Sequence, residues 1–263
     1  MKMLEVSIYN HKSNNLFFSK DLGFRLPFIE YVIRHLKMNL VIFGYRGYGK
    51  SQGTPSEQGV YLDGLAMAKY VFEDKEAEKY IDREQVFLFG RSLGGAIAAR
   101  VALDMNLPFR GIIIENTFTT MGDLVDVMFP FIKYFRKYLL KAKFETIDII
   151  GKIKRPILFC RSEKDELIPK IQMDNLYNSA KGALFKQYYT INEGSHNDGF
   201  RTDIIGYANA IIKFVKECNN YYRSDNKEKE SENIEKKDIF STKEKSCLND
   251  NNKSKLDYQK NHF

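Results

Sequence analysis

Hydrophobic and polar positions along residues 1–222 follow two alternating periods. Short continuous runs of Ile, Val, Leu and Phe are typical of strands that are buried on both faces of a parallel sheet. Such runs occur at 39–44, 85–90, 111–116 and 156–160, more weakly at 185–192, and as short candidates at 5–9 and 16–18. Apolar residues at helical spacing occur at 27–37, 58–73, 92–105 and 203–218. This alternation predicts an α/β fold, a mostly parallel sheet with helices on both faces.

Residues 223–263 differ in composition from the rest of the chain. They are rich in Lys, Glu, Asn, Asp and Ser and contain 10 Lys/Arg against 9 Asp/Glu. Low hydrophobicity with many charges predicts a disordered charged tail. Residues 1–222 then form one α/β domain with 31 Lys/Arg against 25 Asp/Glu, which accounts for +6 of the chain's net charge of +7.

Cysteine and apolar content exclude several classes of protein. No apolar run approaches the ~18 residues of a membrane-spanning helix, and no apolar segment of a signal peptide follows Met1. The three cysteines, Cys160, Cys218 and Cys247, are too few and too scattered for a disulfide framework or a metal site. We therefore expect a cytoplasmic protein that uses no metal and no cofactor.

The first motif after a strand, residues 44–51, has the glycine and Gly-Lys-Ser spacing of a phosphate-binding P-loop. A P-loop needs a helix that starts at once, so that its amides point at the phosphate. Here Gly53 and Pro55 delay the helix to about residue 57. Nucleotide binding is therefore a distant alternative. The same stretch contains a Gly-x-Ser-x-Gly pattern centred on Ser51. No predicted strand runs directly into it and no predicted helix directly follows it, so it does not have the setting of a nucleophile.

A second motif, Gly90-Arg91-Ser92-Leu93-Gly94, joins a predicted strand directly to a predicted helix. This is the setting of a nucleophile elbow, which lifts a serine to the carboxyl edge of the sheet. The glycines supply the small residues that such a turn needs, and the N–H of Leu93 at the helix start can stabilise an oxyanion. The alternative is a tight turn that contains a serine by chance.

A nucleophilic Ser92 requires a base, and the base requires an acid that orients it. In enzymes whose nucleophilic serine lies on such an elbow, the catalytic residues follow one another along the chain in the order serine, acid, histidine. His196 is the one histidine that follows Ser92 before the tail begins. The acid is expected in the loop after 156–160, where Glu163, Asp165 and Glu166 compete. A compact carboxylate just before the next helix favours Asp165 over the two glutamates.

Together these motifs resemble the α/β-hydrolases, and within them the Bem-type group. This group includes relatives of α/β-hydrolase-domain-containing proteins thirteen and seventeen, the latter being protein depalmitoylases. The matching stretches lie at 45–51, 59–63, 87–95, 115–118, 165–169 and 195–198, and the resemblance covers about residues 25–218. It implies a serine hydrolase for esters or thioesters, such as S-acylated proteins, with Ser92 as nucleophile, Asp165 as acid and His196 as base.

The chain departs from this family before Arg25. Members carry a His-Gly-Asn-Ala-Gly-Asn loop whose amides supply the second oxyanion donor, whereas residues 15–24 read Asn-Leu-Phe-Phe-Ser-Lys-Asp-Leu-Gly-Phe. We expect shortened amino-terminal strands, no counterpart of the family's membrane anchor, and an incomplete oxyanion hole for which Ser19 or Lys20 would have to substitute. The rival function is a catalytically impaired hydrolase fold that acts as a membrane-associated binding module.

Residues 117–155 are expected to form a lid over the site. Within them, residues 129–144 combine apolar side chains at helical spacing with five Lys/Arg and no acidic residue. An ordinary lid helix would turn its apolar face to the site. A basic aromatic helix can also lie on an anionic membrane surface. The expected partners are an acyl ester or thioester, including lipidated proteins, and a peripheral membrane contact through 129–144, but no nucleic acid.

Overall fold

The computed structural model describes residues 2–6 (backbone only), 25–49, 51–104, 106–132, 134 and 140–225. The chain divides into two units, Met1–Cys218 and Asn219–Phe263. Of the second unit, residues 219–225 are described and are helical. The remainder of the predicted charged tail lies outside the described residues.

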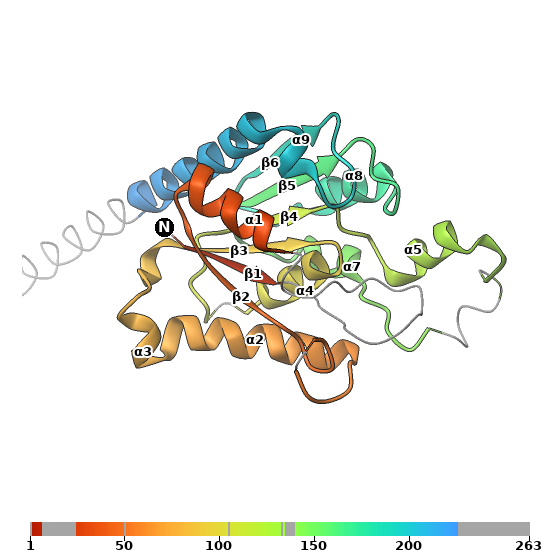
Figure 1. The fold of residues 1–263 in the computed structure, drawn as a ribbon, viewed down its shortest axis with the longest axis horizontal. Helices are drawn as coiled ribbons and strands as arrows, with labels where there is room; N and C mark the ends of the chain where they lie inside the picture. Colours follow the sequence, from red (N-terminus) through yellow and green to blue (C-terminus); the bar gives the residue numbers. More distant parts are fainter. Residues whose placement is uncertain are drawn as a thin grey trace, which may run out of the picture. The chain divides into compact units, whose positions relative to one another are not determined.

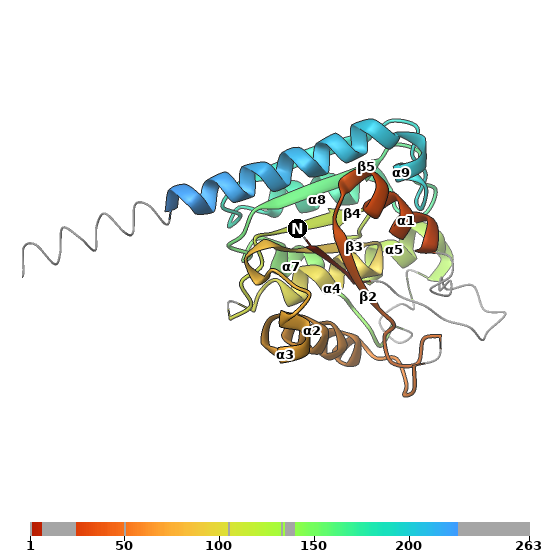
Figure 2. The ribbon, with the colours of Figure 1, turned by 60° about the vertical axis from the view of Figure 1, so that its left-hand side comes forward.

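The first unit is built on a parallel sheet (Figures 1 and 2). Its strands are β1 (Lys2–Val6), β2 (Asn39–Phe43), β3 (Val86–Arg91), β4 (Gly111–Glu115), β5 (Ile157–Ser162) and β6 (Lys186–Ile191). They lie in the order β2-β1-β3-β4-β5-β6, and every neighbouring pair is parallel. Strand β2 follows β1 on one side of it, whereas β3 and the later strands lie on its other side. The direction in which strands are added therefore reverses between β1 and β3. Ligands of α/β sheets bind beyond the carboxyl ends of strands at such a switch point.

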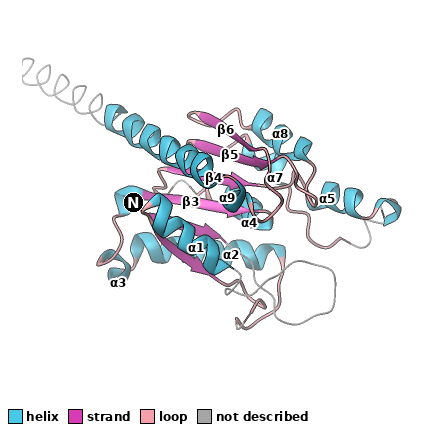
Figure 3. Ribbon diagram, turned by 45° about the horizontal axis from the view of Figure 1, so that its top comes forward, coloured by secondary structure: helices cyan, strands magenta, loops and turns pink. Residues whose placement is uncertain are grey.

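Helices cover both faces of the sheet, as Figure 3 makes clear. They are α1 (Leu26–Tyr31), the π-helix η2 (Val32–Leu36), α2 (Glu57–Glu73), α3 (Lys75–Glu78), η3 (Arg83–Gln85), α4 (Leu93–Val101), α5 (Met121–Met128), η4 (Pro130–Ile132), α7 (Thr146–Ile150), α8 (Lys170–Ser179), α9 (Gly199–Thr202) and helical residues 204–218. None of the described helices combines the length and apolar content needed to cross a bilayer.

Alternate side chains of each central strand enter two separate cores. Val86 and Leu88 of β3 pack with α2, α4, α7 and α8, whereas Phe87 and Phe89 pack with α1, η2, α9 and residues 204–218. Both sets are buried. This is the reason that the strands read as continuous apolar runs, and it confirms the predicted three-layer α/β architecture.

Several predicted boundaries are wrong. The described first strand, Lys2–Val6, begins three residues before the predicted start at residue 5, where it pairs with β2 and β3 from Lys2 onward. Residues 7–9 of that prediction lie outside the described residues. The helix expected at 92–105 ends at Val101. The predicted strand at 16–18 lies outside the described residues. So does much of the helix predicted over 129–144, of which the described parts are the short turn η4 and a non-helical stretch at 140–145.

Candidate active site

The nucleophile candidate Ser92 is the single residue between β3 and α4. Its backbone angles, φ 56° and ψ −127°, lie in a region that residues other than glycine rarely adopt. Holding a residue in such a backbone conformation costs about 1–3 kcal/mol. A Cβ on Gly90 would lie 2.3 Å from a backbone oxygen in the first turn of α4, and one on Gly95 would lie 1.7 Å from Oγ1 of Thr117. The turn therefore depends on glycine at both positions. The sequence motif anticipated this crowding.

His196 and Asp165 meet at the carboxyl edge of the sheet. Nδ1 of His196 lies 2.8 Å from Oδ2 of Asp165, and both side chains are about 95% buried or more, with exposed fractions of 5% and 3%. The other carboxylate oxygen, Oδ1, accepts hydrogen bonds from the backbone N–H groups of Leu167 (2.9 Å) and Ile168 (2.8 Å). These donors fix the carboxylate, and the carboxylate in turn fixes the imidazole. His196 lines the cavity, and no hydrogen bond to its second ring nitrogen, Nε2, is found among the described residues.

The two competing acids have other roles. Glu163 forms ion pairs with Arg161 and Lys170. The hydrogen bond from Lys170, followed by the charges of Arg161 and Lys170, lowers the pKa of the Glu163 carboxyl. Glu166 accepts a hydrogen bond from the backbone N–H of His196 at 3.1 Å and so holds the loop rather than the ring. Among the three carboxylates, Asp165 is the one bonded to the imidazole.

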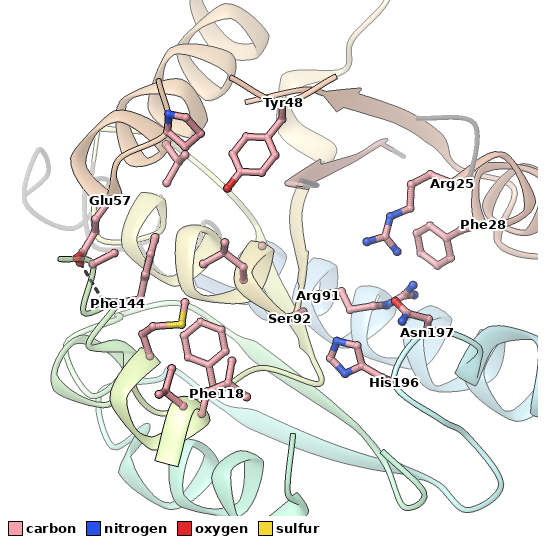
Figure 4. Close-up of a pocket in the computed structure, with 18 of the residues that line it drawn as sticks. Arg25, Phe28, Tyr48, Glu57, Arg91, Ser92, Phe118, Phe144, His196 and Asn197 are labelled. Atoms are coloured by element: carbon pink, nitrogen blue, oxygen red, sulfur yellow. Dashed lines mark hydrogen bonds between the residues drawn. The ribbon is translucent and has the colours of Figure 1, made fainter. Parts of the chain in front are cut away.

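Ser92 and His196 line one cavity of about 770 Å³. Figure 4 shows the imidazole beside the serine at the cavity wall. No hydrogen bond joins these two described side chains, and in hydrolases such contacts commonly tighten only when substrate binds. Leu93, which opens α4, lines the same wall. Its N–H belongs to the first helical turn, whose donors have no partner within the helix. The candidate substitutes for the second oxyanion donor, Ser19 and Lys20, lie outside the described residues.

Comparison with known proteins assigns the family. The family model described as "Serine aminopeptidase, S33" matches residues 33–148. The α/β hydrolase domain-containing protein WAV2 of Arabidopsis thaliana is 35% identical over 218 residues, which cover 76% of this chain and 69% of that protein. The chain belongs to the α/β-hydrolase family. Family membership supports a hydrolase, and it confirms the superfamily part of the resemblance found in the sequence.

Two further similarities agree with this α/β-hydrolase assignment. Protein bem46 of Schizosaccharomyces pombe is 33% identical over 198 residues, 75% of this chain and 64% of that protein. The hydrolase therefore spans roughly two thirds of the length of these two relatives. The solved structure of the Pyrococcus furiosus esterase Pf2001 superposes with a TM-score of 0.61 at 16% identity, over 82% of each chain. At that identity the likeness concerns the fold alone, and it confirms the predicted fold class.

Asn116, at the end of β4, is a residue of the hydrolase site whose role the sequence did not reveal. Its side chain is buried, with 1% of the residue exposed, and its φ of 45° is one that asparagine tolerates well. Its Oδ1 accepts from the N–H of Ser162 at 2.8 Å. Its Nδ2 donates to Oγ of Ser162 (3.0 Å) and to the carbonyls of Ser195 (3.4 Å) and His196 (3.1 Å). One amide thus ties the ends of β4 and β5 to the histidine loop.

Replacing Asn116 with aspartate is expected to lower kcat/KM for an ester about 10- to 100-fold. In the variant a carboxylate oxygen would replace the donor Nδ2 and face the carbonyl oxygens of Ser195 and His196. Leaving buried polar groups without a hydrogen-bond partner costs about 1–3 kcal/mol. The measurement is steady-state hydrolysis by Asn116→Asp, with the exposed Asn106→Asp as control. Equal rates for both variants would contradict a positioning role for Asn116.

A second feature that the sequence did not reveal lies beneath the elbow. Arg91 forms a two-pronged ion pair with Glu115, at 2.9 and 3.2 Å, and their side chains are 1% and 0% exposed. Tyr207 donates its hydroxyl to the same carboxylate. Burial, together with the Glu115 charge, raises the pKa of Tyr207 well above its ordinary value. The tyrosine is therefore a permanent donor, and the buried carboxylate is fully paired.

Arg91→Met is expected to lower the free energy of unfolding by about 3–5 kcal/mol, because it leaves Glu115 buried without its cation. The double variant Arg91→Met/Glu115→Gln should recover part of this loss, since the buried charge is then removed as well. Both are measured by urea denaturation. Arg34→Met, which breaks the exposed pair with Glu30, is the control and should have little effect. A single variant as stable as that control would contradict the account.

Proposed function

We propose that this α/β-hydrolase is a serine hydrolase that cleaves an ester or thioester by acyl transfer. The observation that carries the proposal is the buried 2.8 Å contact between His196 Nδ1 and Asp165 Oδ2, on the wall of the cavity that Ser92 also lines. An oriented imidazole beside a serine on a strained turn supplies both the base and the exposed nucleophile that acyl transfer needs.

The mechanism follows from these positions. Asp165 keeps the imidazole proton on Nδ1, so Nε2 of His196 takes the hydroxyl proton as Oγ of Ser92 attacks the carbonyl carbon. The N–H of Leu93 donates to the developing oxyanion. The tetrahedral intermediate collapses, the C–O or C–S bond breaks, and His196 returns the proton to the leaving alcohol or thiol. Water then attacks the acyl-serine with His196 again as base, which releases the acid and restores the serine.

An apolar wall of the cavity suits the acyl chain. It is formed by Phe118, Met121, Leu124, Val125 and Phe144. The finer proposal, a thioesterase for S-acylated proteins, is supported by the resemblance to protein depalmitoylases. The test is hydrolysis of one peptide palmitoylated either on cysteine or on serine. A thioesterase prefers the cysteine form, a general esterase cleaves both, and a protein that cleaves neither peptide nor a 4-nitrophenyl ester contradicts the proposal.

The second candidate function is a catalytically impaired binding module at a membrane surface. Two observations favour it: residues 15–24 lack the family's glycine-rich loop, and Phe131 and Tyr134 of the lid segment are 72% and 85% exposed. Loss of one oxyanion donor costs about 100- to 1,000-fold in rate. Anionic vesicles test it. A peripheral membrane contact is supported if vesicle binding weakens with added salt and on replacing Lys133, Arg136 and Lys137 with Glu. Vesicle binding that changes neither with salt nor with these substitutions contradicts it.

A further inference from the structure

The loop that joins β2 to α2, whose glycine spacing imitates a P-loop, brings a tyrosine to the cavity. Tyr48 of this loop lines the cavity together with Ser92 and Leu93. Figure 4 shows its ring directed into the cavity, with the hydroxyl at the inner end. A phenolic hydroxyl both donates and accepts hydrogen bonds, so its place beside the elbow bears on the chemistry there.

Contacts on both sides of Tyr48 hold this loop in place. Arg46 forms a fork of hydrogen bonds with the carboxylate of Asp63 in α2, at 2.7 to 3.1 Å, and its backbone N–H donates to the same carboxylate at 2.9 Å. The backbone N–H of Tyr48 donates to the carbonyl of Tyr45 at 3.0 Å, and its carbonyl accepts from the N–H of Ser51 at 3.0 Å. Tyr45 is fully buried. The Tyr48 ring is therefore presented to the cavity from a braced turn.

The hydroxyl of Tyr48 is available as a donor within the described part of the chain. No hydrogen bond joins it to another described residue, and the ring is half-buried in the cavity wall. Burial raises the pKa of this phenol above its ordinary value. The hydroxyl therefore keeps its proton at neutral pH and can share it with an oxygen that gains negative charge.

Negative charge develops on the carbonyl oxygen of the substrate when Ser92 attacks. The leaving group must lie next to His196 to receive its proton, so the carbonyl oxygen is directed away from the imidazole. Figure 4 shows Tyr48 and His196 on opposite sides of the elbow. An oxyanion accepts more than one hydrogen bond, so a donor on the Tyr48 side can act together with the N–H of Leu93.

Three other polar side chains of the cavity wall are placed less well for this role. Ser56 caps α2, and its Oγ accepts from the N–H of Gly59 at 3.1 Å. Asn197 and Arg25 lie on the same side of the elbow as His196 in Figure 4, where the leaving group is expected. The position opposite the base therefore favours the tyrosine.

We propose that Tyr48 is a catalytic residue whose hydroxyl donates a hydrogen bond to the oxyanion at Ser92, alongside the N–H of Leu93. The inference rests on the proposed acyl transfer. When Oγ of Ser92, or later water, adds to the carbonyl carbon, the electron pair of the C=O bond moves to the oxygen, where the tyrosine O–H stabilises it. The pair returns as the leaving group departs, and the tyrosine keeps its proton throughout.

The kinetic test is Tyr48→Phe, which removes the hydroxyl and keeps the ring. For a 4-nitrophenyl ester, kcat and kcat/KM should both fall about 100- to 1,000-fold, because the lost hydrogen bond stabilises the transition state rather than the bound substrate. Tyr80→Phe, at a residue that is 74% exposed, is the control and should hydrolyse the ester like wild type. A loss in kcat/KM at unchanged kcat would assign the hydroxyl to substrate binding and would overturn the proposal.

An alkyl trifluoromethyl ketone gives a second measurement that does not depend on turnover. Oγ of Ser92 adds to its carbonyl carbon, and the adduct carries the same tetrahedral oxyanion as the reaction. The ketone should inhibit Tyr48→Phe more weakly than wild type, by about the factor lost in kcat/KM, since analogues of the transition state report its stabilisation. The corresponding alcohol cannot form the adduct and should inhibit both proteins equally.

The failure of this inference and the failure of the proposed function give different results. Ester hydrolysis that requires Ser92 but is equally fast in wild type and in folded Tyr48→Phe, with equal inhibition by the ketone, would overturn the role of Tyr48 and leave the serine hydrolase intact. A wild type that hydrolyses no ester, or a Ser92→Ala protein that hydrolyses it as fast as wild type, would overturn the proposed function and this inference with it.

Discussion

Ser92→Ala is expected to lower kcat for a 4-nitrophenyl ester by about 10⁶-fold, the loss seen when the nucleophile of a triad hydrolase is removed. Alanine fits the elbow as well as serine does, so the fold and the cavity should be retained. His196 and Asp165 remain in contact but have no hydroxyl to activate. The measurement is the initial rate at saturating ester, with circular dichroism to establish that the variant is folded.

The chain offers a matched control for this substitution. Ser51 is the centre of the other Gly-x-Ser-x-Gly pattern, and its Oγ donates to the carbonyl of Gly44 at 3.2 Å in an exposed turn. The next helix, α2, begins only at Glu57, after the Ser56 cap. Ser51→Ala should therefore hydrolyse the ester at the wild-type rate. Loss of activity in Ser51→Ala with activity retained in Ser92→Ala would reverse the assignment of the nucleophile.

Asp165→Asn is expected to lower kcat by about 10⁴-fold with little change in KM. The amide oxygen can take over the bonds from the N–H groups of Leu167 and Ile168, which turns the amide NH₂ toward Nδ1 of His196. The imidazole would then accept at Nδ1 and carry its proton on Nε2. That tautomer cannot take a proton from Ser92. Steady-state kinetics with the same ester measures the effect.

Glu163→Gln is the control for Asp165→Asn, because it changes a nearby carboxylate in the same loop. Glu163 pairs with Arg161 and Lys170 and has no contact with the imidazole among the described hydrogen bonds. Its replacement is expected to leave kcat close to the wild-type value. Comparable losses in Glu163→Gln and Asp165→Asn would indicate a general effect of charge in this loop and would remove the basis for Asp165 as the acid.

The parts of the molecule that follow from local pattern could be predicted from the sequence. Buried strands of a parallel sheet are apolar on both faces, which located β3, β4 and β5 to within one or two residues at each end. The edge strands β2 and β6 are mostly half-buried, and their apolar runs located them equally closely. The strand, turn and helix around Ser92 identified the elbow because the small residues at Gly90 and Gly95 are required there. The order of residues along the chain then left His196 as the candidate base.

Contacts between distant residues could not be predicted in the same way. Asn116 reaches the carbonyl of His196 across 80 positions, and the Arg91–Glu115 pair joins two strands that are 24 positions apart. Neither pairing leaves a local signature, because an asparagine or an arginine at a strand end has many possible partners. The register of β1 likewise depends on β2 and β3. The expectations for Ser19, Lys20 and the middle of the lid stay predictions.

Covalent labelling with a fluorophosphonate tests the central claim most directly, since the reagent reacts only with a serine that a working base has activated. Folded wild-type protein is predicted to take up one label, which peptide mass spectrometry locates on Ser92. Asp165→Asn should slow the labelling and Ser92→Ala should abolish it, whereas Ser51→Ala should label like wild type. A folded wild-type protein that stays unlabelled, or that carries the label on another serine, would contradict the account.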